Sequence, residues 1–457
     1  MDQKKEKRIE QNRNKNRSFH ASRFDQAYSR IGDLTYEYNA DTGLAYASPV
    51  RGVWNIVHIA TLVPEGHQIF VCPTSCLRGV VLTTAEMGGM DKLSTITVGE
   101  DNILEGDMEE MLFSGTERII RELPEKPRMI MIFTSCIHHF MAVNYHRVYK
   151  LLQDKYPEID FVDCYMDPIM RRTAPVVPSL WRQLHRVLKP VDNLNPKQVN
   201  LIGNCFPHQK DYCDLTALLF NHGIKVMELN SCKTYDEFQK ESESCCNFVF
   251  HNHGVKAAKD MEIRLKQKWF KLRPGYSYEE YDQDLKEVSH LLGISPPSDE
   301  ELDNMKAKVE DKVEETCRML EGMPVSIDYT AVDHPLELAL YLIRHGFRVE
   351  SVYVDVFTEG QEIFEKLKEE APDLKIYQTS GWNMRQMDRH REEKILCIGQ
   401  KAAYFNDSNH FVNVIENEAM YGYRGILALM QHVEHAYKEE KPMKELVQIK
   451  GWGCNCI

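Results

Sequence analysis

The sequence contains no uninterrupted apolar run of about 18 residues, the length that a membrane-spanning helix needs. Residues 1–17 are charged and have no apolar core, so they do not resemble a signal peptide. We therefore expect a protein of the cytoplasm with no membrane partner. In that reducing compartment the 13 cysteines are expected to be thiols or metal ligands rather than disulfides.

An excess of basic residues is missing as well. The 56 lysines and arginines are outnumbered by 69 aspartates and glutamates, which gives a formal net charge of -13. Binding to phosphates needs clustered positive charge, so we expect no nucleic-acid partner. No phosphate-binding P-loop occurs, and any ATP hydrolysis would have to reside in another protein.

Strands and helices alternate along the 457 residues, which predicts an α/β fold with doubly wound parallel sheets. A chain of this length exceeds what one hydrophobic core usually supports. The predicted segments are a polar N-terminal arm (1–34), a first α/β domain that carries the cysteine turns (35–195), a second with a helical insertion (196–322), a third (323–415), and a C-terminal helix and tail (416–457).

Two apolar runs end in small polar turns that carry a cysteine. Residues 69–72 lead to Cys76, and residues 129–133 lead to Cys136. Neighbouring strands of a parallel sheet would bring both thiols to one edge, where open α/β sheets bind ligands. Thiolates suit iron-sulfur clusters, zinc or copper(I), whereas free cysteines are also among the most buried residues. A metal site and two structural cysteines are about equally expected from this spacing.

Further polar residues follow predicted strands. His138 comes directly after the second cysteine turn, where it would either line a cluster, relay protons or simply begin a helix. Cys205 and His208 lie at the strand-to-helix turn of the second unit and would face its crevice, a candidate substrate cavity. His251 and His253 would bind a metal or an anionic substrate, or lie in an ordinary polar loop.

Five motifs in a fixed order make the chain resemble the nitrogenase component 1 superfamily. They are residues 48–53 (SPVRGV), the turn at Cys76, the acidic stretch 99–106 (GEDNILEG), the strand that ends at Cys136, and residues 421–425 (YGYRG). This superfamily includes molybdenum-iron protein subunits, cofactor-assembly scaffolds and tetrapyrrole reductases. The resemblance implies three Rossmann-like domains.

The resemblance also implies an iron-sulfur cluster shared with a partner subunit and held by up to three cysteines of the first domain. Cys76 and Cys136 match the second and third positions, whereas the first falls on Ser48. Serine is a much rarer iron ligand than thiolate, and Cys72 is an alternative third thiol. Pairing of the chain with itself would give four thiolates for one [4Fe-4S] cluster; a distinct homologous subunit would supply the missing ligand itself.

Dinitrogen-reducing members of the superfamily hold a further metal cofactor through a cysteine of the second domain and a histidine before the last helix. The histidine position falls on Tyr421 here, and the cysteine position falls near residues 248–253, just after Cys245 and Cys246. Neither ligand is clearly present, so we do not expect dinitrogen reduction.

The resemblance implies a reductase subunit that receives low-potential electrons from an ATP-hydrolysing iron-sulfur reductase. It would pass them through the shared cluster to an unidentified substrate. Two alternatives remain: a scaffold on which a metal cofactor is assembled, and a structural subunit whose partner carries the chemistry.

Overall fold

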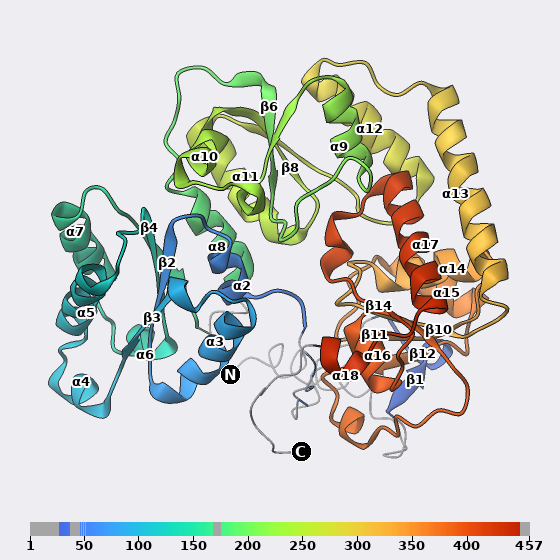
Figure 1. Ribbon diagram of the computed structural model, residues 1–457, viewed down its shortest axis with the longest axis horizontal. Coiled ribbons are helices and arrows are strands. Elements are labelled where there is room, and N and C mark those ends of the chain that lie inside the picture. The colour runs from blue at the N-terminus through green and yellow to red at the C-terminus, as the bar shows by residue number, and fades with distance from the viewer. Residues whose placement is uncertain are drawn as a thin grey trace, which may run out of the picture.

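The computed structural model describes residues 27–36, 46, 48, 50, 52–167 and 175–447. Its strands form three separate sheets, each flanked by helices, and the three lobes surround a common centre (Figure 1). The prediction of an α/β fold with three doubly wound parallel sheets is therefore confirmed. None of the described helices combines the length and apolar character that crossing a membrane requires.

The first sheet holds both cysteine turns. Its order is β3-β2-β4-β5, and every pairing is parallel. All residues of the two central strands are buried, as in sheets that helices cover on both faces. Alternate side chains enter two different core clusters, with Phe70 on one face and Ile69 on the other. The strands are β2 (Gly66–Cys72), β3 (Leu93–Thr97), β4 (Met129–Thr134) and β5 (Asp160–Tyr165).

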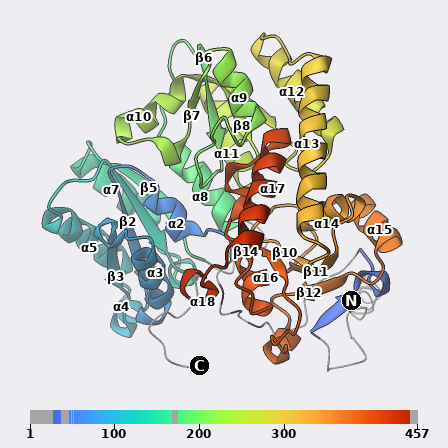
Figure 2. The same ribbon diagram turned by 45° about the vertical axis from the view of Figure 1, so that its right-hand side comes forward.

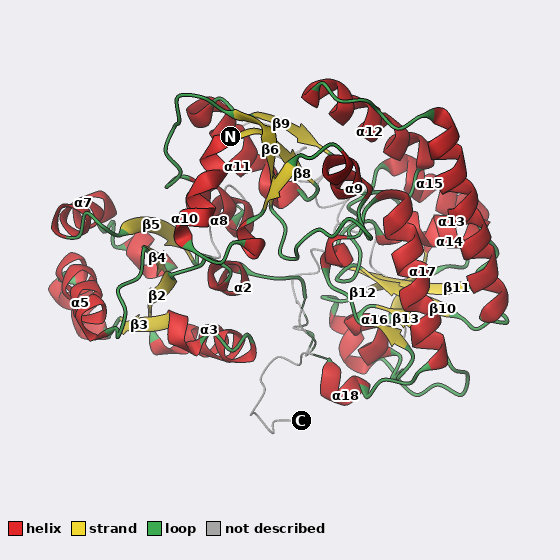
Figure 3. Cartoon of the chain, turned by 45° about the horizontal axis from the view of Figure 1, so that its top comes forward, coloured by secondary structure: helices red, strands yellow, loops and turns green. Residues whose placement is uncertain are grey.

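Helices cover both faces of this sheet (Figure 3). The short α2 (Ile56–Thr61) begins where the Asn55 side chain accepts from the Val57 N–H. The acidic stretch 99–106 forms the short helix α4 (Glu100–Glu105). The other helices are α3 (Thr74–Glu86), α5 (Met108–Glu122), α6 (Cys136–Phe140), α7 (Tyr145–Lys155) and α8 (Val176–His185).

The second sheet has the parallel order β7-β6-β8-β9, so β6 and β8 are its central strands. Its strands are β6 (Asn195–Ile202), β7 (Lys225–Met227), β8 (Ser244–Val249) and β9 (Lys268–Lys271), and its main helices are α9 (Asp214–Asn221) and α11 (Asn252–Leu265). The helical insertion consists of α12 (Tyr278–Leu292) and α13 (Asp299–Met319). The last long helix, α17 (Gly422–Lys438), packs along α13 and joins the second and third lobes (Figure 2).

The third sheet has the order β1-β12-β11-β10-β13-β14. Its strands are β10 (Val325–Asp328), β11 (Val349–Val354), β12 (Lys375–Gln378), β13 (Leu396–Ile398) and β14 (Phe411–Val412), with α14 (Pro335–Arg344), α15 (Gln361–Glu370) and α16 (Gln400–Phe405). The edge strand β1 (Tyr28–Arg30) pairs antiparallel with β12. These residues belong to the segment that the sequence predicts as a polar arm, so the end of that segment adds a strand to the last domain.

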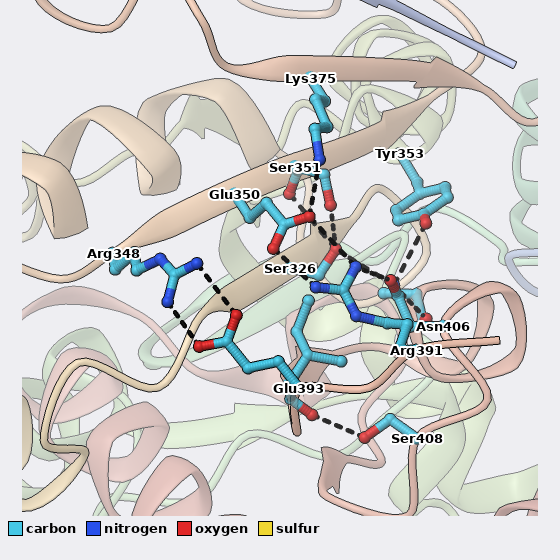
Figure 4. A network of polar contacts seen from close by, with 12 residues as sticks. Ser326, Arg348, Glu350, Ser351, Tyr353, Lys375, Arg391, Glu393, Asn406 and Ser408 are labelled. Atoms are coloured by element: carbon cyan, nitrogen blue, oxygen red, sulfur yellow. Dashed lines mark hydrogen bonds and ion pairs between the residues drawn. The ribbon is translucent and has the colours of Figure 1, made fainter. Parts of the chain in front are cut away.

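A network of polar side chains links β11 and β12 of the third lobe to the loop before β13 (Figure 4). Arg391 binds both carboxylate oxygens of Glu350, at 2.7 and 3.1 Å, and Lys375 donates to the same carboxylate at 2.9 Å. Asn406 receives an N–H from Arg391 and donates to the hydroxyl of Tyr353 at 3.2 Å. Bidentate arginine–carboxylate pairs are among the stronger polar contacts, so this network fixes the loop that leads into β13.

Candidate metal site at the first sheet

The two predicted cysteines lie at the same edge of the first sheet. β2 and β4 are hydrogen-bonded neighbours, with Val71 opposite Thr134. Cys76 lies in the first turn of α3, which follows β2, and Cys136 is the first residue of α6, which follows β4. Neighbouring strands are about 4.8 Å apart, so the two turns leave the sheet side by side. Figure 1 shows α3, α4 and α6 together at the lower end of this lobe.

Exposure separates the three cysteines of these turns. Among the cysteines of the described residues, Cys76 alone is exposed; Cys136 is half-buried, and neither forms a disulfide. Cys72 ends β2 inside the core and is 0% exposed. Burial, with a smaller effect from Cys76, raises the pKa of the Cys72 thiol to about 12, which keeps it protonated. The donor set at the surface therefore consists of two thiols, which suits half of the ligands of a [4Fe-4S] cluster.

Large apolar side chains are exposed on the helices that leave the same edge. Leu104 on α4 is 83% exposed, and Phe140 and Met141 at the end of α6 are 68% and 42% exposed. Exposed apolar residues that gather near one another typically mark contact surfaces. These side chains, on helices that follow β3 and β4, are candidates for contact with another chain.

Ser48 is buried in the segment that precedes the first domain's sheet. The hydroxyl of Ser48 is buried and has no hydrogen-bond partner among the described residues. On one side of it the Tyr46 N–H donates to Ser380, and on the other side Val50 packs into the core of the third domain. The described residues on either side of Ser48 therefore contact the third domain, and Ser48 as a cluster ligand stays a prediction.

His138 points into the lobe. It follows Cys136 by two residues, which is about 200° around a helix, and its ring packs near Tyr145. Its Nδ1 lies 3.3 Å from the Ser135 hydroxyl, and burial lowers its pKa to about 4 despite a hydrogen bond to the Ser135 backbone. A neutral His138 ring that contacts Ser135, the residue before α6, fits the predicted role at the start of a helix.

The predicted residues of the second unit meet the other lobes at the centre of the molecule. The Cys205 thiol donates to Glu416, and the Trp54 N–H, which precedes α2, donates to the same carboxylate at 2.9 Å. His251 forms a hydrogen bond with Asp333, which follows β10. The backbone of the first domain's start and side chains of the second and third domains are thereby joined.

Ionisation at this junction depends on these contacts. Burial raises the pKa of Glu416 to about 7, with His251 opposing and Asp333 adding to the effect. For His251, burial lowers the pKa, but the Asp333 carboxylate more than compensates and raises it to about 8. Near neutral pH the His251–Asp333 pair is therefore charged, while Glu416 is partly protonated.

Residues 416–419 form a left-handed turn at this junction. Their φ angles are 50°, 58°, 45° and 65°, although none of the four is glycine. Such conformations cost about 1–2 kcal/mol per residue. The turn is held by Glu416 and Asn417, whose N–H groups donate at 2.8 Å to the carbonyls of Thr330 and Ala331.

Sequence reasoning missed Asp333 and Glu416 as members of this junction. Asp333 stands just before Pro335, the first residue of α14, and Glu416 stands in the loop after β14. Both positions follow strands of the third sheet, which is a weak signal of a ligand-binding edge. Contacts with Trp54 and His251 help to bury Glu416 and half-bury Asp333, and no local pattern reveals them.

His208 and His253 differ in how they are held. His208 donates its backbone N–H to Glu228 at 3.0 Å, and its Nδ1 lies 2.6 Å from the same carboxylate. Its ring stacks on Phe250, with centroids 4.4 Å apart. His253 is half-buried in the first turn of α11.

No group of three histidine, cysteine or acidic side chains within the described ranges is arranged to hold a metal ion. At the position expected for a cofactor histidine, the hydroxyl of Tyr421 donates to Asp284 at 2.7 Å. Cys246 is buried within β8 rather than at its carboxyl end, and Cys245 precedes it. The residues present therefore do not fit the second cofactor of dinitrogen-reducing relatives.

Three lobes, each built on a mainly parallel sheet with flanking helices, define a class of multidomain α/β protein. The chain belongs to the family described as nitrogenase component 1 type oxidoreductase, whose model matches residues 67–438. The resemblance seen in the sequence is therefore confirmed.

Solved structures show the same fold. One described as "Nitrogenase Cp1 at pH 6.5" is 13% identical, with a TM-score of 0.62, over 86% of this chain and 93% of that one. A second, "Nitrogenase Cp1 at pH 5", is 11% identical, with a TM-score of 0.55, over 89% and 91% of the two chains. A comparison with curated protein sequences gives no match.

Proposed function

We propose that this chain is the component 1 subunit of a nitrogenase-like reductase. It would accept low-potential electrons from an ATP-dependent iron-sulfur reductase and pass them through a cluster at a subunit interface to a substrate. The observation that carries this proposal is the placement of Cys76 and Cys136 at the carboxyl ends of neighbouring strands, with Cys76 exposed. The family match supports an oxidoreductase that works with partner chains.

Each residue of the edge would have a separate task. The thiolates of Cys76 and Cys136 would hold the cluster, which when bound supplies one-electron transfer. The N-terminal turn of α3 directs backbone N–H groups towards the negative charge that Cys76 would carry. Burial of Cys72 as a protonated thiol would exclude it from this set, so the remaining ligands would come from the partner.

Subunit pairing would complete the site. Two copies of the chain would contribute four thiolates, the number that one [4Fe-4S] cluster needs. Leu104, Phe140 and Met141 would be covered by the partner and would keep water from the cluster. A paired homologous chain with its own cysteines would serve the same purpose.

A second candidate is a subunit that holds the complex together or carries a cofactor during its assembly. It is favoured by the junction between the lobes, where His251, Glu416 and Tyr421 are engaged with other side chains of the chain itself. In that case the reduction would occur elsewhere in the complex.

Anaerobic purification followed by iron and sulfide analysis and electron paramagnetic resonance tests the proposal. We expect about four irons per pair of subunits and a signal after reduction by dithionite. A folded, colourless protein without iron would reject the electron-relay function. Metal that moves from the protein to another protein over time, and does not remain during turnover, would favour the assembly role.

A further inference from the structure

The second sheet has an edge that the proposed electron relay does not use. β6 pairs with β7 on one side and with β8 on the other, so the crevice between the carboxyl ends of β6 and β8 is a topological switch point. Open α/β sheets bind ligands at such points. Asn204 and Cys205 follow β6 there, and His251 and His253 follow β8.

The helix that begins at this edge has a free N-terminus. α11 has 14 residues, its N-cap residue His251 makes no side-chain capping bond, and its first turn contains no acidic residue. The Gly254 N–H donates to the carbonyl of His251 at 3.1 Å, whereas among the described residues the N–H groups of Asn252 and His253 meet no backbone acceptor. A helix N-terminus of this kind attracts anions through its N–H groups and its dipole.

An independent observation is the side chain of Asn204. It is 4% exposed, and neither its oxygen nor its nitrogen has a hydrogen-bond partner among the described residues. A buried amide without partners costs about 1–3 kcal/mol, and native proteins rarely keep one without a ligand, water or function. The amide is therefore available to a bound molecule.

Tight backbone packing brings Asn204 to the start of α11. Gly203 has a φ of +90°, and a Cβ there would lie 2.6 Å from the nitrogen of Gly254. A Cβ on Gly254 would in turn lie 2.4 Å from the carbonyl oxygen of Ile202. Only glycines permit this contact, and it sets the residue after Gly203 beside the first turn of the helix.

Groups of both charge signs surround this point. Asp333 is paired with His251, and Lys271 donates to the side chain of Asn252 at 2.6 Å. Glu416, beside Cys205, is the remaining carboxylate. His253 and His334 also face Asp333.

We propose that the Asn204 amide and the first turn of α11 bind an oxyanion, the carboxylate or phosphate group of the substrate. This inference rests on the proposed function in one respect: it assigns the anion to the molecule that is reduced. The Nδ2 group of Asn204 donates to the anion together with the N–H groups of Asn252 and His253. The substrate of the reductase is accordingly an anionic molecule that enters at the junction of the lobes.

The test uses the full-length protein, purified anaerobically with any partner that accompanies it. Inorganic phosphate and succinate are titrated separately by calorimetry and thermal shift, against sodium chloride of equal ionic strength. We expect saturable binding of one of the two anions and at least about tenfold weaker binding by Asn204→Asp, which replaces the donor with a like charge. The matched control is Asn221→Asp, the same change at an exposed position of α9.

A second variant guards against misfolding. Asn204→Ala removes the donor without adding charge, and a folded Asn204→Ala protein should also bind about tenfold more weakly. Wild-type protein that binds neither anion better than chloride would overturn the proposal. So would a folded variant at position 204 that binds as tightly as the wild type.

Iron content separates this inference from the proposed function. Cys76→Ala should lose iron and keep anion binding, whereas Asn204→Ala should keep iron and lose anion binding. Wild-type protein without iron that still binds the anion would refute the electron relay alone. Iron-loaded protein without anion binding would refute the subsite alone.

The pH dependence gives a further check. The titratable and charged groups that interact with Glu416, His251 or Asp333 beside this point are Cys205, His253, His334 and Lys271. Binding should weaken as pH rises from 6 to 9, because Glu416 becomes charged and His251 becomes neutral. Glu416→Gln should bind the anion more tightly than the wild type at pH 8.5. If its affinity between pH 6 and 9 fell as steeply as that of the wild type, or more steeply, this account would be contradicted.

Discussion

The first and third sheets end in edges of the same kind, yet their polar groups are used differently. At the third sheet, Asp328 is buried and accepts the N–H groups of Ala402 and Thr330, both at 2.8 Å. Beside it, Lys401 donates to Tyr329 at 3.0 Å. At the first sheet, Cys76 is exposed and Cys136 is half-exposed.

The difference shows that a sheet edge can bind a ligand when its polar groups are not already hydrogen-bonded within the chain. At the third edge the Asp328 carboxylate already accepts backbone N–H groups of the chain itself, so few of its lone pairs remain for a ligand. The first edge keeps two thiols at the surface beside apolar side chains. We therefore expect substitutions at the first edge to change metal content and pairing, and substitutions at the third to change stability.

The largest effect is expected at the first edge. Cys76→Ala and Cys136→Ala should each remove most of the iron, because a cluster that loses one of two thiolates from a subunit is not retained. The matched control is Cys317→Ala, a half-buried cysteine of α13. Iron analysis of the anaerobic proteins measures the effect, and full iron content in either edge variant would remove the basis of the comparison.

At the third edge we expect lost stability with unchanged iron. Asp328→Ala leaves two buried N–H donors without an acceptor and should lower stability by about 3 kcal/mol. Urea denaturation followed by circular dichroism measures this change. Asp328→Asn, which keeps one acceptor, should lose less; equal stability of Asp328→Ala and wild type would show that this edge is not self-stabilised.

A smaller, pH-dependent effect is expected at the ion network of the third lobe. Burial raises the pKa of Glu350, but Arg391 and Lys375 outweigh it and lower the pKa from 4.5 to about 2. The charged pair therefore stabilises the protein fully above pH 4.5, and this stability is lost as the pH falls through about 2. Glu350→Gln should be less stable by about 1–2 kcal/mol at pH 7, and the gap should shrink towards pH 2.

Denaturant midpoints of Glu350→Gln and wild type at pH 7, 4 and 2.5 provide the measurement. A gap that stays constant between pH 7 and pH 2.5 would show that charge on Glu350 is not the cause.

The smallest effect on folding is expected from the apolar surface of the first edge. Phe140→Ser should change stability by less than about 0.5 kcal/mol, because the side chain is 68% exposed. It should nevertheless weaken subunit pairing severalfold, as measured by analytical ultracentrifugation. Phe220→Ser, on a similarly exposed side chain of α9, is the control; equal pairing of both variants would place the interface elsewhere.

Much of this architecture could be predicted from local pattern. The apolar runs of β2 and β4 and the turns after them are enough to place Cys76 and Cys136 at one edge, because a parallel sheet aligns the carboxyl ends of its strands. The exposure of one thiol and the burial of Cys72 could not be predicted. They depend on which helix residues cover the strand ends.

Other features depend on contacts between distant segments. The three residues of β1 are too few to show a pattern, and only pairing with β12 defines them as a strand. Glu416 and Asp333 became recognisable as junction residues only when three lobes were brought together. The unpartnered amide of Asn204 is likewise visible only from the burial around it.

The left-handed turn at residues 416–419 has a consequence for biosynthesis. An emerging polypeptide would not adopt four such φ angles unaided, and the acceptors that hold them, on Thr330 and Ala331, belong to a lobe made earlier. The turn at residues 416–419 can therefore form only after all three lobes have been translated, and it then fixes their contacts with one another. A ribosome-stalled chain that stops at residue 415 should contain folded lobes that have not yet locked together.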